Sequence, residues 1–70
     1  MKEDIETLGD ALPKETARVR EVLGHYRDIG PAGAFGAMMI EQELQRADAA
    51  MISGDLVAMI RAYKALQEIK

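Results

Sequence analysis

Apolar residues recur at every third or fourth position along most of this chain, which is the period of an amphipathic α-helix. The longest pattern covers residues 31–52, where steps of four, three, four, three and four positions connect Gly33, Ala37, Ile40, Leu44, Ala47 and Met51. No window alternates apolar and polar residues over the length that a half-buried strand needs. The pattern therefore predicts an all-α protein whose longest helix carries a nearly straight apolar seam.

Two further segments carry apolar stripes with the same period. Within residues 13–29 the stripe consists of Val19, Val22, Leu23, Tyr26 and Ile29. Within residues 55–69 it consists of Leu56, Met59, Ile60, Tyr63 and Leu66, and the opposite side carries Arg61, Lys64 and Glu68. We expect each helix to bury its stripe and to expose its other face.

Glycine and proline mark the predicted helix boundaries. Pro13 suits the first position of a helix, where its missing N–H has no helical partner to lose. Gly30-Pro31 can end one helix and start the next, and Gly54-Asp55 offers a left-handed cap followed by an N-cap. Because both links are very short, neighbouring helices must fold back on each other.

The N-terminal segment adds a short helix to this prediction. Residues 3–8 place Ile5 and Leu8 on one side, followed by Leu12, and Gly9 can end the segment. The predicted architecture is a single domain over residues 1–70, namely a three-helix bundle with a short N-terminal helical extension. Its helices are expected at about residues 3–8, 13–29, 31–52 and 55–69.

Length and composition limit how such a domain can be stabilised. The chain has 70 residues, no cysteine and a single histidine, His25, so disulfides and structural zinc are not expected. A core of this size gives only a narrow margin of stability. Efficient helix packing, self-association or docking onto a larger protein remain as sources of stability.

Charge and hydropathy disfavour two classes of partner. Nine basic and twelve acidic residues give a net charge of −3, which repels nucleic-acid phosphates unless the cations are gathered on one face. The basic residues of the first long helix (Lys14, Arg18, Arg20 and Arg27) alternate with acidic ones, as is usual on a solvated face. No segment approaches the roughly 20 apolar residues that span a bilayer, and no export signal is evident, so a cytoplasmic location is expected.

The residues do not predict catalysis, a metal or a cofactor. His25 is the only histidine, and neither of the helical metal-ligand spacings, His-x-x-x-His and Glu-x-x-His, occurs. The stretch 30–36 is rich in glycine but lacks the Lys-Ser/Thr ending of a phosphate-binding loop. We interpret Gly33 and Gly36 as positions where the chain turns sharply or another helix approaches closely. The chain is therefore expected not to be an enzyme.

A second apolar face on the long helix is the best candidate for function. On a helical wheel Phe35, Met38 and Met39 lie roughly opposite the Gly33–Met51 seam, on a face shared with Gln42, Arg46 and Ala49. One possible cover is the N-terminal segment, through Ile5 and Leu8; the other is a second protein, since Phe and Met are enriched at adaptable interfaces. The predicted partner-binding residues are Phe35, Met38, Met39, Gln42 and Arg46.

Two resemblances bear on these expectations. Residues 54–66, with a Gly54-Asp55 turn followed by an Ile60…Tyr63…Ala65-Leu66 pattern, are similar to the second helix of a tetratricopeptide repeat. One copy cannot stack on itself, so we attribute the similarity to shared rules of capping and packing. From Leu12 onward the chain is similar to small prophage-borne helical proteins, and its acidic, compact, cysteine-free form resembles type I anti-CRISPR proteins. That resemblance implies a stoichiometric inhibitor that blocks a host nucleoprotein complex by occupying a surface.

The leading hypothesis is thus a non-catalytic protein-binding module of the phage-inhibitor type. The first alternative is a homodimeric module that uses the Phe35 face for itself. A small DNA-binding regulator is a further alternative, but the outward positions of the last helix offer only Arg61 as a donor to base edges.

Overall fold

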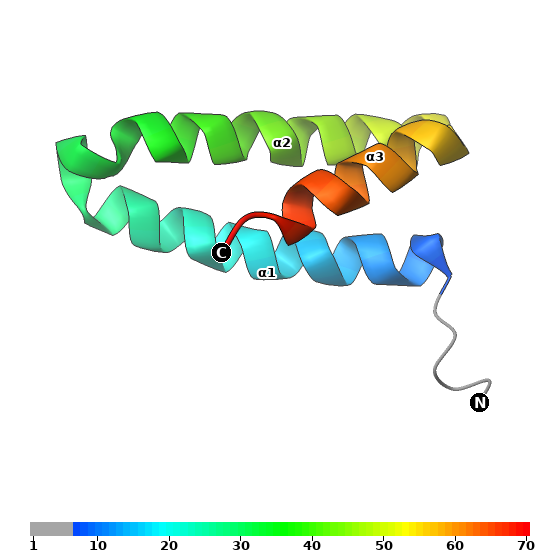
Figure 1. Cartoon of the computed structure of the whole chain (residues 1–70), viewed down its shortest axis with the longest axis horizontal. Coiled ribbons are helices and arrows are strands. Elements are labelled where there is room, and N and C mark those ends of the chain that lie inside the picture. Colours follow the sequence, from blue (N-terminus) through cyan, green and yellow to red (C-terminus); the bar gives the residue numbers. More distant parts are fainter. Residues whose placement is uncertain (1–6) are drawn as a thin grey trace.

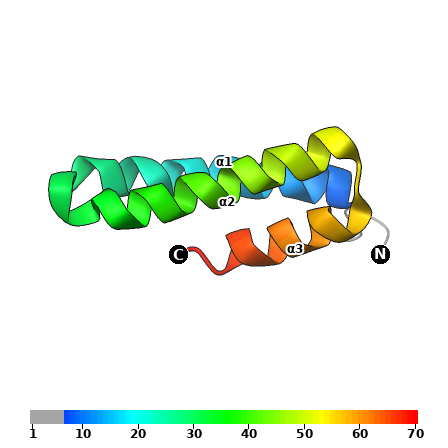
Figure 2. The same cartoon turned by 90° about the horizontal axis from the view of Figure 1, so that it is seen from above.

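Three helices pack together in the computed structural model, which describes residues 7–70 (Figure 1). They are α1 (Leu8–Asp28), α2 (Ala34–Ser53) and α3 (Leu56–Gln67), and a one-turn 3-10 helix, η2 (Gly30–Gly33), links the first two. The helices α1 and α2 lie antiparallel as a long hairpin, and α3 turns back across it (Figures 1 and 2). The predicted all-α three-helix bundle is confirmed.

The first helix begins five residues earlier than predicted. Thr7 is its N-cap, and the Thr7 hydroxyl oxygen accepts a hydrogen bond of 3.2 Å from the backbone N–H of Asp10. Gly9, which was expected to end a separate extension, therefore lies in the first turn of α1. The prediction of a separate helix over residues 3–8 is wrong at its end, because Thr7 is the N-cap of α1 and Leu8 is the first residue of α1; residues 3–6 lie outside the described part of the chain.

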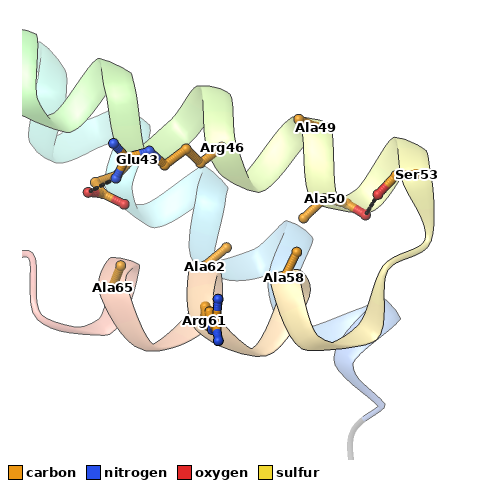
Figure 3. A pocket seen from close by; sticks show the side chains of 9 residues that line it. All are labelled: Glu43, Arg46, Ala49, Ala50, Ser53, Ala58, Arg61, Ala62 and Ala65. Atoms are coloured by element: carbon orange, nitrogen blue, oxygen red, sulfur yellow. Dashed lines mark hydrogen bonds and ion pairs between the residues drawn. The ribbon is translucent and has the colours of Figure 1, made fainter.

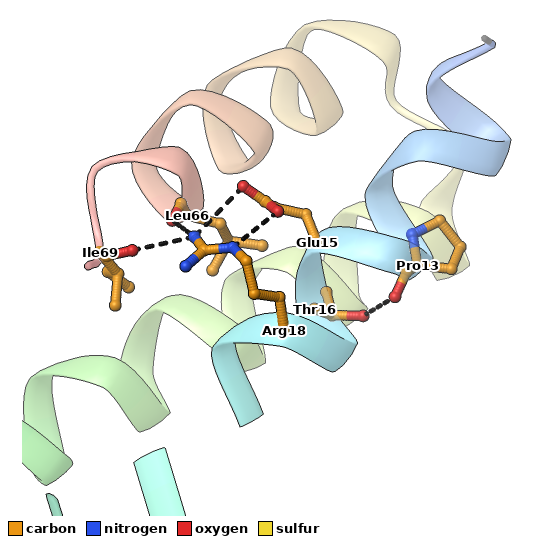
Figure 4. Close-up of polar contacts among 6 residues, drawn as sticks. All are labelled: Pro13, Glu15, Thr16, Arg18, Leu66 and Ile69. Carbon is orange, nitrogen blue, oxygen red and sulfur yellow. Dashed lines mark hydrogen bonds and ion pairs between the residues drawn. The ribbon is translucent and has the colours of Figure 1, made fainter. Parts of the chain in front are cut away.

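Pro13 lies inside α1 and not at its start. A proline there removes the hydrogen bond that the carbonyl of Gly9 would accept in a regular helix. Burial offsets that loss, because Leu12 is completely buried in the core and Thr16, one turn later, is almost completely buried. The Thr16 hydroxyl donates a 2.8 Å hydrogen bond to the carbonyl of Pro13 and so has its own partner (Figure 4).

The link between α1 and α2 is a close approach that only glycine permits. Gly30 has φ +83°, and the chain then makes one 3-10 turn before α2 begins at Ala34, three residues later than predicted. A Cβ at Gly33 would overlap the backbone carbonyl of Tyr26, and a Cβ at Gly36 would lie 2.6 Å from two ring carbons of Tyr26. The prediction of a close approach at both glycines is confirmed.

The link between α2 and α3 has the predicted caps. Gly54 adopts φ +72°, and its N–H donates to the carbonyl of Ala50 at 3.0 Å. A carboxylate oxygen of Asp55 accepts a hydrogen bond of 3.2 Å from the N–H of Ala58, which caps α3. The chain therefore reverses direction within two residues.

The core lies between the three helices. The predicted seam of α2 is buried from Gly33 to Ala47, and Met51 at its end is half-buried. The apolar core residues are Leu12, Val19, Leu23, Ala37, Ile40, Leu44, Ala47, Ala50, Ala62 and Leu66. In α1, Val19 and Leu23 are buried as predicted, whereas Ile29 at the end of the stripe is 60% exposed because α1 ends at Asp28.

The buried face of α3 differs from the prediction. Leu66 is fully buried as expected, and Met59 and Tyr63 are half-buried against the core. Leu56 and Ile60, however, are exposed, and the smaller Ala62 takes the central buried position. The helix is turned so that its alanines face α2.

Ion pairs connect the helices on their outer sides. Arg18 of α1 donates hydrogen bonds to Glu15 and to backbone carbonyls at the end of α3 (Figure 4). Arg20 pairs with Asp48 of α2 at 3.5 Å, and Arg27 pairs with Glu41 of the same helix. These three arginines were expected on a solvated face; their side chains are indeed 41–58% exposed, and each also pairs with a carboxylate.

None of the helices in residues 7–70 combines the length and the apolar character that crossing a bilayer requires.

Candidate functional site

The third helix is too short to cover the whole α1–α2 hairpin. At 1.5 Å per residue α1 is about 31 Å long, whereas α3 is about 18 Å long. The helix α3 starts beside the open end of the hairpin, and the chain ends part-way along it (Figures 1 and 2). Within residues 7–70, therefore, no third helix packs on the closed end of the hairpin around η2.

Four large apolar side chains are exposed at that closed end. They are Ile29 at the end of α1 and, on one face of α2, Phe35, Met38 and Met39; we call the surface formed by these last three residues the hairpin end. Phe35 is 70% exposed, and the two methionines are each more than 40% exposed. A 70-residue domain with one phenylalanine would gain stability by burying it, yet the structure places it outside the core. Large exposed apolar clusters on small domains mark contact surfaces more often than single exposed residues do.

The N-terminal segment was the alternative cover for this surface. Leu8 lies at the start of α1, at the opposite end of the bundle from η2 (Figure 1). It is half-buried there and cannot reach Phe35. Ile5, the other residue of that alternative, lies outside the described residues.

The other two predicted contact residues lie in different surroundings. Gln42 is exposed and continues the hairpin end by one turn along α2. Arg46 lies one turn further and pairs with Glu43 of the same helix at 3.2 Å. Both Arg46 and Glu43 line a groove between α2 and α3 (Figure 3). The structure thus groups Gln42 with the hairpin end and assigns Arg46 to the groove.

A small hollow lies where the C-terminal residues meet the hairpin. It has a volume of about 340 Å³, and its lining includes Tyr26, Met39 and Ile69. Glu68 and Lys70 supply the charges of its rim. Because Met39 also belongs to the hairpin end, the apolar surface extends into this hollow.

The α2–α3 groove is the larger cavity, with a volume of about 610 Å³. Small side chains form most of its lining, and Ala50, Ala58 and Ala62 point toward one another across it (Figure 3). Arg61 also lines it and has no carboxylate partner within residues 7–70. The groove is therefore apolar at its floor and charged along one part of its rim.

A ridge of three aliphatic residues on α3 was missed from the sequence. Leu56, Val57 and Ile60 are 61%, 57% and 42% exposed, although two of them were predicted to be buried. The run of five apolar residues at 56–60 gave no single stripe, which is the signal that more than one face of this helix is apolar.

The described residues do not form a recognisable catalytic or metal site. No group of three or more His, Asp or Glu side chains within residues 7–70 is arranged to hold a metal ion. His25 is exposed in the last turn of α1. The hydroxyls of Thr16 and Ser53 donate to carbonyls of their own helices. The absence of catalytic activity remains a prediction.

Neither a protein-family model, nor a curated protein, nor a solved structure matches this chain.

Proposed function

We propose that this chain is a non-catalytic protein-binding module whose contact surface is the hairpin end, extended by Gln42. The observation that supports it is the exposure of Phe35, the single phenylalanine, beside two exposed methionines. Aromatic anchors dominate the energetics of many interfaces, and methionine adapts its shape to a partner. Within residues 7–70 no third helix packs at this end of the hairpin, so a partner has access to the outer face of α2.

A photo-crosslinking residue placed at position 35 tests this proposal in living cells. The expected result is one main crosslinked protein, identified by mass spectrometry. Glu21 is the control position, because it is exposed on α1 away from the hairpin end. Equal crosslinking from both positions would contradict a specific contact at Phe35.

The resemblance to phage-borne inhibitors supports a narrower proposal, in which the partner is a host nucleoprotein complex. The net charge of −3 suits a molecule that competes with nucleic acid for a basic surface. Purified type I CRISPR interference complexes are the first probe to use, with size-exclusion co-elution as the measurement. Co-elution that is lost in the Phe35→Gln, Met39→Gln double variant is expected. Absence of co-elution would contradict this narrower proposal, and the partner would then be identified from the protein crosslinked at position 35.

The alternative function is self-association through the hairpin end. The same double variant separates the two, because it would then change the oligomeric state of the purified protein and not only its binding to a host protein.

A further inference from the structure

Two residues of the hairpin end begin a longer exposed strip that follows α2 to its far end. We call this strip the outer face of α2. It consists of Phe35, Met38, Gln42, Gln45, Ala49 and Ile52, which are all exposed. On a helical wheel the six residues fall within an arc of about 100°. The helices α1 and α3 pack against the opposite side of α2, so within residues 7–70 no element covers this face (Figure 1).

The outer face carries no charge, although 30% of the residues in the chain are charged. The charged residues of α2 lie to either side of it, and each is paired within the chain. The pairs are Glu41 with Arg27, Asp48 with Arg20, and Glu43 with Arg46. Charged residues are depleted at the centre of protein interfaces, whereas a solvated helix face usually carries them. A charged group of a partner would lose its water on this face without meeting an opposite charge, so the face is complementary to an uncharged surface.

The spacing of the outer face is that of a coiled-coil seam. Successive residues are separated by three, four, three, four and three positions, which is an average repeat of 3.5 residues. The strip is about 26 Å long, because an α-helix rises 1.5 Å per residue. A straight strip of this kind packs lengthwise against a second α-helix. Addition of a partner's strand would need an exposed sheet edge, and residues 7–70 contain no strand.

The centre and the ends of the outer face differ in chemistry. Phe35 and Ile52 make its ends apolar, whereas Gln42 and Gln45 place two amides near its centre. Neither amide has a hydrogen-bond partner within residues 7–70. An amide that a partner buries needs a hydrogen bond from that partner. A polar residue at such a position also fixes how two helices align along the seam.

We propose that the partner docks an amphipathic α-helix lengthwise on the outer face of α2, from Phe35 to Ile52. The contact stripe of that helix is uncharged, with apolar side chains at both ends and an amide or hydroxyl side chain opposite Gln42 and Gln45. The inference rests on the proposed function, because the hairpin end forms one end of the strip. It adds Gln45, Ala49 and Ile52 to the contact surface.

A photo-crosslinking residue at position 52, used beside the one at position 35, tests this docking mode in living cells. Both positions should capture the same protein. Mass spectrometry should place the two attachment sites in one segment of that protein, roughly 17 residues apart, because the two helices lie side by side with the same rise per residue. Position 67 is the control, since Gln67 is exposed at the end of α3, and it should not capture this protein.

A charge in the middle of the outer face gives a second test. Gln45→Lys should weaken binding to the purified protein captured at position 35 by at least about tenfold, because the ammonium group would be buried there without a counter-charge. Gln67→Lys is the matched control, since it makes the same exchange at an exposed helical position away from α2, and its affinity should equal that of the wild type. Circular dichroism verifies that both variants are folded.

The results that overturn the inference differ from those that overturn the proposed function. Capture at position 35 but not at position 52 excludes the lengthwise helix and leaves the hairpin end as the contact. Attachment sites in distant segments of the partner, or wild-type affinity of Gln45→Lys, exclude it as well. Capture of a second copy of the chain at position 52 would assign the outer face to self-association. Absence of a specific capture at position 35 contradicts the proposed function itself, and the inference with it.

Discussion

The guanidinium of Arg18 on α1 donates a 2.9 Å hydrogen bond to the backbone carbonyl of Leu66 in the last turn of α3 (Figure 4). The same nitrogen donates a second hydrogen bond of 2.9 Å to the carbonyl of Ile69. Glu15 holds the guanidinium in place, and its hydrogen bond raises the pKa of Arg18 above the ordinary value of an arginine. A cation is thus fixed at the negative end of the α3 dipole, where it ties α3 to α1.

Replacement of Arg18 by glutamine should therefore lower the melting temperature. The change removes the link between α1 and the end of α3, whereas Arg20→Gln removes only an ion pair whose two side chains are about half exposed. We expect a clear drop for Arg18→Gln and a change near zero for Arg20→Gln, both measured by thermal circular dichroism. Equal melting temperatures for the two variants would show that the carbonyl contacts of Arg18 contribute little.

Leu44 lies in the middle of the α2 seam and is 6% exposed. Leu44→Ala should destabilise the domain by about 2–5 kcal/mol, the range for a buried leucine. That is comparable to the roughly 3–5 kcal/mol that one small core supplies, and Leu44→Asp should abolish cooperative unfolding altogether. Urea denaturation measures the stability loss of Leu44→Ala. Gln45→Asp, at the exposed neighbouring position, is the control for Leu44→Asp. Wild-type unfolding of Leu44→Asp would contradict the burial of the seam.

Two glycines should respond in opposite directions to the same substitution. Gly24 lies inside α1 with open space around the position of a Cβ, so Gly24→Ala should stabilise the domain by about 0.5–1 kcal/mol. Gly33→Ala should destabilise it, because the added methyl group overlaps the backbone carbonyl of Tyr26, which cannot rotate away. The denaturation midpoints of the two variants, each compared with the wild type, test both directions. A Gly33→Ala variant more stable than the wild type would mean that η2 is not tightly packed.

The Phe35→Gln, Met39→Gln double variant should be folded as well as the wild type. Phe35 is 70% exposed and Met39 43% exposed, and neither belongs to the core, so we expect a stability change of no more than about 1 kcal/mol. Binding to a crosslinked partner should nevertheless fall by tenfold or more, as expected from the loss of roughly 1.4 kcal/mol at an anchor. A large stability loss with unchanged binding per folded molecule would show that the surface belongs to the core.

The elements that the sequence predicted well are those with one clear apolar seam and strong end signals. The helix α2 has both, since its seam is regular and Gly54-Asp55 ends it, and its predicted end is within one residue. The start of α1 was misplaced because Pro13 is a strong local signal, whereas the burial of Leu12 is a property of the assembled core. Tertiary packing offset the local preference.

The surfaces were harder to predict for a related reason. Phe35 could be assigned to an outward face because the rest of α2 has a regular seam. In α3 the five apolar residues at 56–60 occupy several faces, so hydrophobicity favoured the larger Leu56 and Ile60 for burial over Ala62. Which residues of α3 are buried depends on how α3 packs against α2 in the folded bundle. The Arg18–Leu66 contact joins residues 48 positions apart and leaves no local pattern.

The short length of α3 also divides the molecule into two parts of unequal protection. The three largest fully buried side chains are Leu12 and Val19 of α1 and Leu66 of α3, and all three belong to one core cluster. Around η2 only two layers of helix in residues 7–70 protect the backbone, so the amides of η2 should exchange with deuterium through local opening. The amides near Leu44 should exchange only when the whole domain unfolds. The surface that carries Phe35 is thus on the part of the fold that can most easily change shape to fit what it binds.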